Sequence, residues 1–175
     1  MKILQELLNS LKKDAPVRTI LVGVHWTVVT SLGCGLASTW SEKNTHNHNP
    51  VREVGQLHKK SARELAQFAL SDNLLEASVG IAAFNSLIDV APGKLKEVNA
   101  SEVIRRECPA KNLVIIGHFP FADKMRGIAR NLWIIEKNPF GDDFPEEAAQ
   151  EYVPQADIVA ITGTAFINHT MEGLL

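Results

Sequence analysis

The last third of the chain contains three short apolar runs that are separated by longer, more polar segments. The runs cover Asn112 to Gly117, Leu132 to Glu136 and Asp157 to Thr162. A continuous apolar run of this length is typical of a strand that is buried on both faces of a parallel sheet. Between the runs, Ala122 to Arg130 can be helical and Pro145 opens a helix as its first-turn residue. The alternation predicts a parallel α/β sheet with right-handed crossovers.

The first two thirds of the chain have a different pattern, in which strands come first and helices follow. The β-branched segment from Thr19 to Trp40 predicts a meander of two or three antiparallel strands with glycines at the turn. Ser61 and Glu64 have the spacing of a capping box at a helix N-terminus. Leu74 to Val90 predicts a helix that is apolar on most sides and therefore mostly buried. This order indicates an α+β unit.

The change of pattern near residue 110 predicts two domains. We expect an α+β domain over residues 1–109 and an α/β domain over residues 110–175. Three strands are few for a doubly wound sheet, which usually has five or six. We therefore expect the second domain to be truncated at its C-terminal end. An incomplete sheet edge would favour pairing with a second copy of the chain, and hence a homo-oligomer.

Composition excludes several classes of partner. The net charge is −2 and the basic residues are scattered, whereas a nucleic-acid-binding protein needs a basic stripe. No apolar run reaches the roughly 20 residues that a membrane-spanning helix requires, so we expect no membrane partner. Cys34 and Cys108 lie far apart and form no motif, which is typical of reduced structural thiols. We therefore expect a cytoplasmic protein.

Polar residues follow the first two predicted strands. Gly117 permits a close backbone approach, and His118 is a candidate for proton transfer because an imidazole titrates near neutral pH. The alternative for His118 is a structural or surface histidine. Glu136 ends the second strand about 20 residues after Gly117, where a carboxylate commonly accepts hydrogen bonds from ribose hydroxyls. The alternative is a solvated carboxylate, and Asn138 follows close behind.

The loop after the first strand departs from the glycine pattern of dinucleotide-binding proteins. It lacks G-x-G-x-x-G, and Phe119 and Pro120 occupy the space where a pyrophosphate would lie. Standard dinucleotide binding is therefore disfavoured. The spacing of Gly117 and Glu136 also suits pockets of the adenosyl-methionine type, which tolerate looser glycine patterns, but the Phe119-Pro120 loop departs from the glycine loop of methyltransferases as well.

The third predicted strand ends in Thr162, Gly163 and Thr164, just before a predicted helix. Hydroxyls and amides in such a turn bind an anion or the polar tail of a ligand. Plain helix capping by one of the threonines is the alternative, and both roles are compatible. Asn168 and Thr170 lie within the next turn or two, where we expect them to face the same cleft.

Two further candidates lie in the first part of the chain. His46 and His48 form an H-x-H pair in a polar loop with Glu42 nearby, which could bind one metal ion, although spacing fixes no third ligand. A solvated loop is the alternative. Asn85 stands inside the apolar helix, and its buried amide needs partners. It either ties the helix to a neighbouring loop or reaches a site between the two domains.

Together, the segments VIIGHFPF, IIEKNP and ITGTAFINHTMEGLL resemble a bacterial and archaeal family described as putative heavy-metal chelation. The resemblance extends to VGVHWTVVTSLGCGLAST and AAFNSLID, so it covers essentially the whole chain. It implies an enolase N-terminal-like α+β domain followed by a Rossmann-like α/β domain, with a cleft between the two. It also implies chemistry on pterin-, flavin- or siderophore-like molecules, or the handling of metals through such chelators.

Three functions follow from these observations. The first is an enzyme or binder that acts on a small chelator or heteroaromatic molecule, with no cofactor identified. In this function Glu136 binds the ligand, His118 transfers a proton and the amides of residues 162–164 hold an anionic group. The second is a metal-binding or metal-delivery module that uses His46 and His48. The third is an adenosyl-methionine-dependent methyltransferase.

Overall fold

The computed structural model describes residues 1–40 and 51–175, and its contacts group these residues into two compact units. The first unit comprises Met1–Pro92, Gly163–Gly173 and Leu175, and the second comprises Gly93–Thr162 and Leu174. Each unit has its own sheet and its own buried apolar cluster. The boundary that we expect after residue 109 lies inside the second unit, and residues 163–173 make their contacts with the first.

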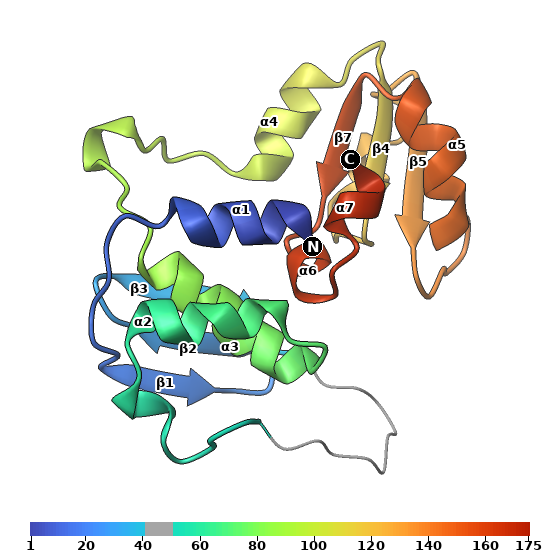
Figure 1. Ribbon diagram of the computed structural model, residues 1–175. Helices are drawn as coiled ribbons and strands as arrows, with labels where there is room; N and C mark the ends of the chain where they lie inside the picture. Colours follow the sequence, from blue (N-terminus) through green and yellow to red (C-terminus); the bar gives the residue numbers. More distant parts are fainter. Residues whose placement is uncertain (41–50) are drawn as a thin grey trace. The chain divides into compact units, whose positions relative to one another are not determined.

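The sheet of the first unit is an antiparallel meander, as the sequence predicts. It consists of β1 (Thr19–Val22), β2 (Trp26–Thr30) and β3 (Cys34–Ser38), in the order β1-β2-β3 (Figure 1). Gly23 lies in the first turn and its amide donates to the carbonyl of Trp26. The second turn closes through a bond from the Ser31 amide to the Gly33 carbonyl.

Helices cover one face of this sheet. The helix α3 (Leu74–Ser86) packs on β2 and β3, and η1 (Leu57–Lys59) lies beside β1. The helices α2 (Ala62–Ala66) and η2 (Gln67–Leu70) pack on α3, and α1 (Lys2–Ser10) contacts η2. The capping box of Ser61 and Glu64 is confirmed at the start of α2. The predicted apolar helix ends at Ser86, earlier than Val90. It packs so closely on β3 that a Cβ atom at Gly35 would collide with the carbonyl oxygen of Ala82.

The chain ends in two short helices, α6 (Thr164–Ile167) and α7 (Met171–Leu174). The turn between them contains His169, whose φ of +60° lies in the left-handed region. The amide and hydroxyl groups of Thr170 both donate to Oδ1 of Asn168, which stabilises this turn. Ile167 is buried in the apolar cluster of the first unit, so α6 belongs to that core.

The second unit contains a four-stranded parallel sheet in the order β6-β5-β4-β7. Its elements in chain order are α4 (Ala100–Glu107), β4 (Asn112–Ile116), η4 (Ala122–Met125), β5 (Asn131–Glu136), β6 (Phe144–Pro145), η5 (Glu146–Ala148), α5 (Ala149–Tyr152), η6 (Val153–Gln155) and β7 (Ile158–Ile161). The parallel sheet and its three main strands are confirmed.

Three details of the second unit differ from the sequence-based expectation. The predicted helix over residues 122–130 is only the four-residue η4, because the chain turns away after Met125. Pro145 ends the short strand β6 and precedes the first residue of η5, so it does not lie inside the helix. Helix α4 was not predicted, and none of its residues is fully buried.

Both cysteines are free thiols, with Cys108 buried and Cys34 exposed on β3. Among the described residues, no helix combines the length and the hydropathy needed to cross a bilayer.

Candidate functional site

The carboxyl ends of β4, β5 and β7 meet at one edge of the parallel sheet. Ile116 lies in register with Ile135 on β5 and with Ile161 on β7. The backbone pairing continues one residue beyond β4, since the Gly117 amide donates to the carbonyl of Ile135 at 2.8 Å. The Thr162 amide donates to the carbonyl of Ile116 at 3.0 Å. This pairing places the residues after β4 beside the ends of both neighbouring strands.

Gly117 has a structural reason to be glycine. Its φ of +97° is a conformation that residues with a Cβ rarely adopt. A Cβ atom at this position would also lie 3.1 Å from Cγ2 of Thr162. Thr162 therefore leaves no room for a larger side chain at Gly117, and the close approach of a ligand to the Gly117 backbone stays a prediction.

His118 forms an acid–base pair with Asp143, a residue for which the sequence pattern predicts no role. Nδ1 of His118 lies 2.8 Å from Oδ2 of Asp143. The side chain of Asp143 is 1% exposed, whereas that of His118 is 38% exposed. The hydrogen bond to Asp143 raises the pKa of His118; burial acts in the opposite direction, and the negative charges of Asp143, Asp123 and Glu136 add to the rise. The imidazole is thus anchored on one side and accessible to solvent.

Glu136 connects the ends of β5 and β4. Its Oε2 accepts a hydrogen bond from the His118 amide at 2.9 Å, and its Oε1 accepts one from the Lys137 amide at 2.8 Å. The carboxylate is therefore more than a solvated strand end, because it holds the backbone of the catalytic candidate His118. A carboxylate oxygen has two lone pairs, so each oxygen keeps capacity for a ligand. Its binding of ligand hydroxyls stays a prediction.

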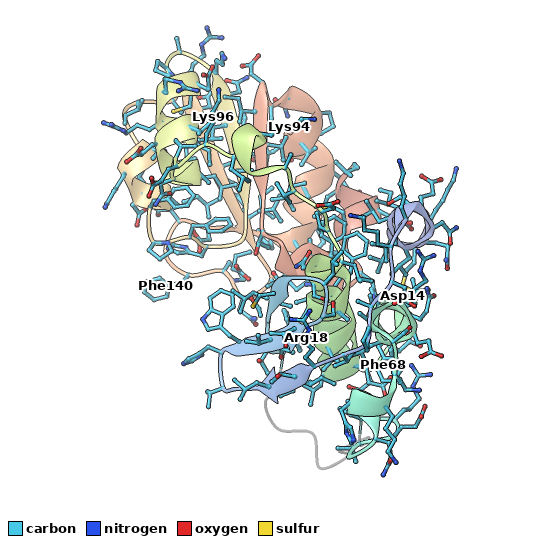
Figure 2. The ribbon with its side chains drawn as sticks, turned by 90° about the vertical axis from the view of Figure 1, so that its left-hand side faces the viewer. Asp14, Arg18, Phe68, Lys94, Lys96 and Phe140 are labelled. Carbon is cyan, nitrogen blue, oxygen red and sulfur yellow. The ribbon has the colours of Figure 1, made fainter. Side chains whose placement is uncertain are left out.

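The loop between β5 and β6 contains Asp143 and a largely exposed aromatic residue, Phe140. The Phe140 amide donates to Oδ2 of Asp143 at 3.3 Å, which helps to place the carboxylate. The ring of Phe140 is 82% exposed (Figure 2). Asn138 is also exposed in this loop, and its role in ligand binding stays a prediction.

The remaining predicted residues near the chain end lie in or beside the short helix α6. Helix α6 begins after Gly163, which has no capping side chain, and Thr164 is its first residue. Asn168 accepts hydrogen bonds from Thr170 and so stabilises the turn that follows. The anion-binding role of Thr162, Gly163 and Thr164 stays a prediction.

Asn85 has a defined partner in the first unit. Its Nδ2 donates to the carbonyl of Leu36 at 2.8 Å. The amide thus ties α3 to the strand β3, where the first alternative had a loop, and a ligand role for Asn85 stays a prediction. This bond satisfies one polar group of a half-buried side chain.

The predicted metal ligands His46 and His48 lie outside the described residues, as does Glu42. A metal site there stays a prediction. Within residues 1–40 and 51–175, no group of three or more His, Cys, Asp or Glu side chains is arranged to hold a metal ion.

Comparison with known proteins agrees with the sequence resemblance. Two family models, both described as putative heavy-metal chelation, match residues 4–88 and residues 99–175. The chain belongs to this family. A comparison of the chain with curated protein sequences found no match.

Two solved structures are similar to this chain. One is a protein of unknown function from the DUF364 family of Desulfitobacterium hafniense, with 25% sequence identity and a TM-score of 0.84. The other is a DUF364 family protein of unknown function from Pyrococcus horikoshii, with 20% identity and a TM-score of 0.74. Each similarity covers 99% of this chain and 72% of the other chain. The mixed α+β fold, with one antiparallel and one parallel sheet, is therefore the fold of this family.

Proposed function

We propose that this chain binds a small metal-chelating molecule at the carboxyl edge of its parallel sheet and exchanges protons with it through His118. The observation that supports this proposal is the 2.8 Å bond between Nδ1 of His118 and the buried carboxylate of Asp143. A carboxylate in this position fixes the ring orientation and the tautomer of a histidine that transfers protons at its other nitrogen. Nε2 of His118 is then the exchanging atom.

Proton exchange is the chemistry that interconverts the free and metal-loaded forms of a chelator. The donor atoms of a ligand must be deprotonated to hold a metal ion, so metal uptake releases protons and metal release consumes them. A group that titrates near neutral pH can accept or supply these protons. Asp143 raises the pKa of His118, which favours the protonated ring that would assist metal release.

The metal in this proposal is held by the bound molecule and not by the protein site. The described residues around His118 offer no group of three metal-ligating side chains. They do offer one imidazole and the carboxylate of Glu136, which suit hydroxyl or amine groups of an organic ligand. Pterin-, flavin- and siderophore-like molecules, which the family resemblance implies, have such groups.

We also propose that the second unit is a Rossmann-like sheet and that the first is enolase N-terminal-like. In support, the order β6-β5-β4-β7 is the order of the first four strands of a doubly wound sheet. Ligands of such sheets bind where the strand order reverses, here between β4 and β7. A pyrophosphate ligand is disfavoured because β4 is followed by the four-residue η4 and not by a long helix whose N-terminus would bind phosphate.

Equilibrium titration with neopterin, riboflavin and ferric catecholate tests the proposed function. We expect at least one of these probes to bind, and His118→Ala and Glu136→Gln to weaken its binding about tenfold or more, as expected for loss of a hydrogen bond to a charged group. His58→Ala, which removes an exposed histidine of the first unit, is the matched control and should bind like the wild type. The proposal would be contradicted if none of the three probes bound, or if both site variants bound the probe with the affinity of the wild type.

A further inference from the structure

Two of the three methionines of the chain line one small pocket of the first unit, together with a histidine. The three residues are Met1, His169 and Met171, and the rest of the lining is mainly apolar. The space inside is about 10 Å³, which is room for one atom-sized occupant. A pocket of this size is too small for an organic molecule and has room for a water molecule or a single ion.

The hydrogen bonding of His169 leaves one ring nitrogen for a ligand. Nε2 lies 2.8 Å from the carbonyl oxygen of Ala69, and a carbonyl can only accept, so Nε2 carries the proton. In the neutral ring the lone pair is then on Nδ1. Metal-binding histidines commonly donate their other N–H to a backbone carbonyl in this way, because the bond fixes the tautomer and the ring orientation.

The backbone at His169 is unusual for a residue with a side chain. Its φ is +60°, whereas residues with a Cβ mostly avoid positive φ. Such conformations persist where the surrounding structure requires them, and they are frequent at ligand sites. Here the turn between α6 and α7 holds the imidazole against Ala69 and brings it to the same pocket as Met171, two residues later.

The residue types that line this pocket favour a soft ion. Thioether sulfur favours Cu(I) and similar soft cations, and imidazole also binds copper. Glu172 is the carboxylate in the lining, and it is already bonded to the Met1 ammonium group at 2.6 Å and to the Ile3 amide at 2.7 Å. A hard cation such as Mg²⁺ or Ca²⁺ would need several oxygen ligands, which this pocket does not supply.

We propose that Met1, His169 and Met171 form a binding site for a single soft monovalent cation, Cu(I) or Ag(I). The ligands are the two thioether sulfurs and Nδ1 of His169. The site uses no residue of the His118 site, so the two proposals stand or fall separately.

Methyl NMR of methionine tests this proposal one residue at a time. Protein with ¹³C-labelled methionine methyl groups is titrated with Ag(I), in a Cys34→Ser background because the exposed Cys34 thiol is itself a soft ligand. We expect the Met1 and Met171 resonances to shift and to saturate at one equivalent. Met125, which is buried in the second unit, is the internal control and should not shift. No shift of the first two resonances, or an equal shift of all three, would overturn the proposal.

Substitutions separate ligation from folding. Met171→Leu keeps the side-chain volume, and His169→Asn keeps a residue that tolerates positive φ, so we expect both variants to fold. Each should bind Ag(I) about tenfold more weakly or worse, since even partners that only orient a metal ligand contribute tenfold or more. Met125→Leu is the matched control and should bind with unchanged affinity. Unchanged affinity in both pocket variants, with native melting curves, would refute the assigned ligands.

Discussion

Nδ1 of His118 lies 2.8 Å from Oδ2 of Asp143, and the Asp143 side chain is 1% exposed. The two residues are 25 positions apart and come from different loops at the same edge of the parallel sheet. An exposed imidazole anchored by a buried carboxylate is the arrangement on which the proposed proton exchange depends. Its consequences can be measured without knowing the natural ligand.

The first prediction concerns the pKa of His118. Because the hydrogen bond to Asp143 raises this pKa, Asp143→Asn should lower it. NMR titration of the His118 ring protons measures the change directly. Asp142→Asn is the control, since it removes an exposed neighbouring carboxylate for which no bond to His118 is found. An equal pKa in the wild type and in Asp143→Asn would contradict the assigned role of the pair.

The same pair predicts how stability changes with pH. A histidine whose pKa is raised in the folded state stabilises the fold below its unfolded pKa, and this contribution is lost as pH rises through the folded pKa. His118→Gln should therefore be less stable than the wild type at about pH 5 and closer to it at about pH 9. Urea unfolding at the two pH values measures this difference. If the stability difference between the wild type and His118→Gln were the same at both pH values, the raised pKa of His118 would be contradicted.

Glu76, in the first unit, should make stability depend on pH in the opposite direction. Burial raises the pKa of Glu76, but hydrogen bonds from Ser71 and Arg52 outweigh burial and hold it below its usual range. Its stabilising contribution is present above the unfolded pKa and is lost as pH falls through the folded pKa. The wild type should therefore lose part of its advantage over Glu76→Gln as the solution is acidified.

The size of the Glu76 effect follows from its contacts. Oε2 accepts from Oγ of Ser71 at 2.7 Å and from Nε of Arg52 at 2.8 Å, and the carboxylate is almost fully buried. Arg52 itself is largely exposed, which keeps the ionic contribution small. We expect Glu76→Gln to lower the free energy of unfolding by about 1–3 kcal/mol at neutral pH. Asp72→Asn, at an exposed carboxylate nearby, should change it little.

Much of the fold was predictable because it depends on local patterns. The apolar runs that became β4, β5 and β7 identified the parallel sheet, and the spacing of Ser61 and Glu64 identified the start of α2. Strand β6 was missed because two residues, Phe144 and Pro145, are too few to form a periodic pattern. The assignment of residues 163–173 to the first unit depends on tertiary contacts that no local pattern encodes.

The candidate site was predictable only in part. His118 and Glu136 were selected because they follow apolar strands, and the sheet brings both to one edge. Asp143 was missed because its place is fixed by the fold of the loop between β5 and β6. One available signal was the loop sequence itself, in which two aspartates follow a glycine at the carboxyl end of a strand.

Two glycines give contrasting predictions. Gly117→Ala should destabilise the protein by about 1–3 kcal/mol, because φ is +97° and the added methyl group would press against Thr162. Gly163→Ala should be close to neutral for stability, since a Cβ atom there meets nothing within 4 Å. Thermal unfolding of the two variants checks the contrast. Equal stability of Gly117→Ala and the wild type would show that the turn after β4 tolerates a side chain.

Proton exchange between His118 and a bound chelator can be measured directly. Calorimetric titration of neopterin, riboflavin and ferric catecholate in two buffers with different ionisation heats measures the protons that are exchanged on binding. We expect at least one probe to bind with a net proton exchange that disappears in His118→Gln and persists in His58→Gln. Proton exchange that is the same in the wild type and in His118→Gln, or no binding by any probe, would contradict it.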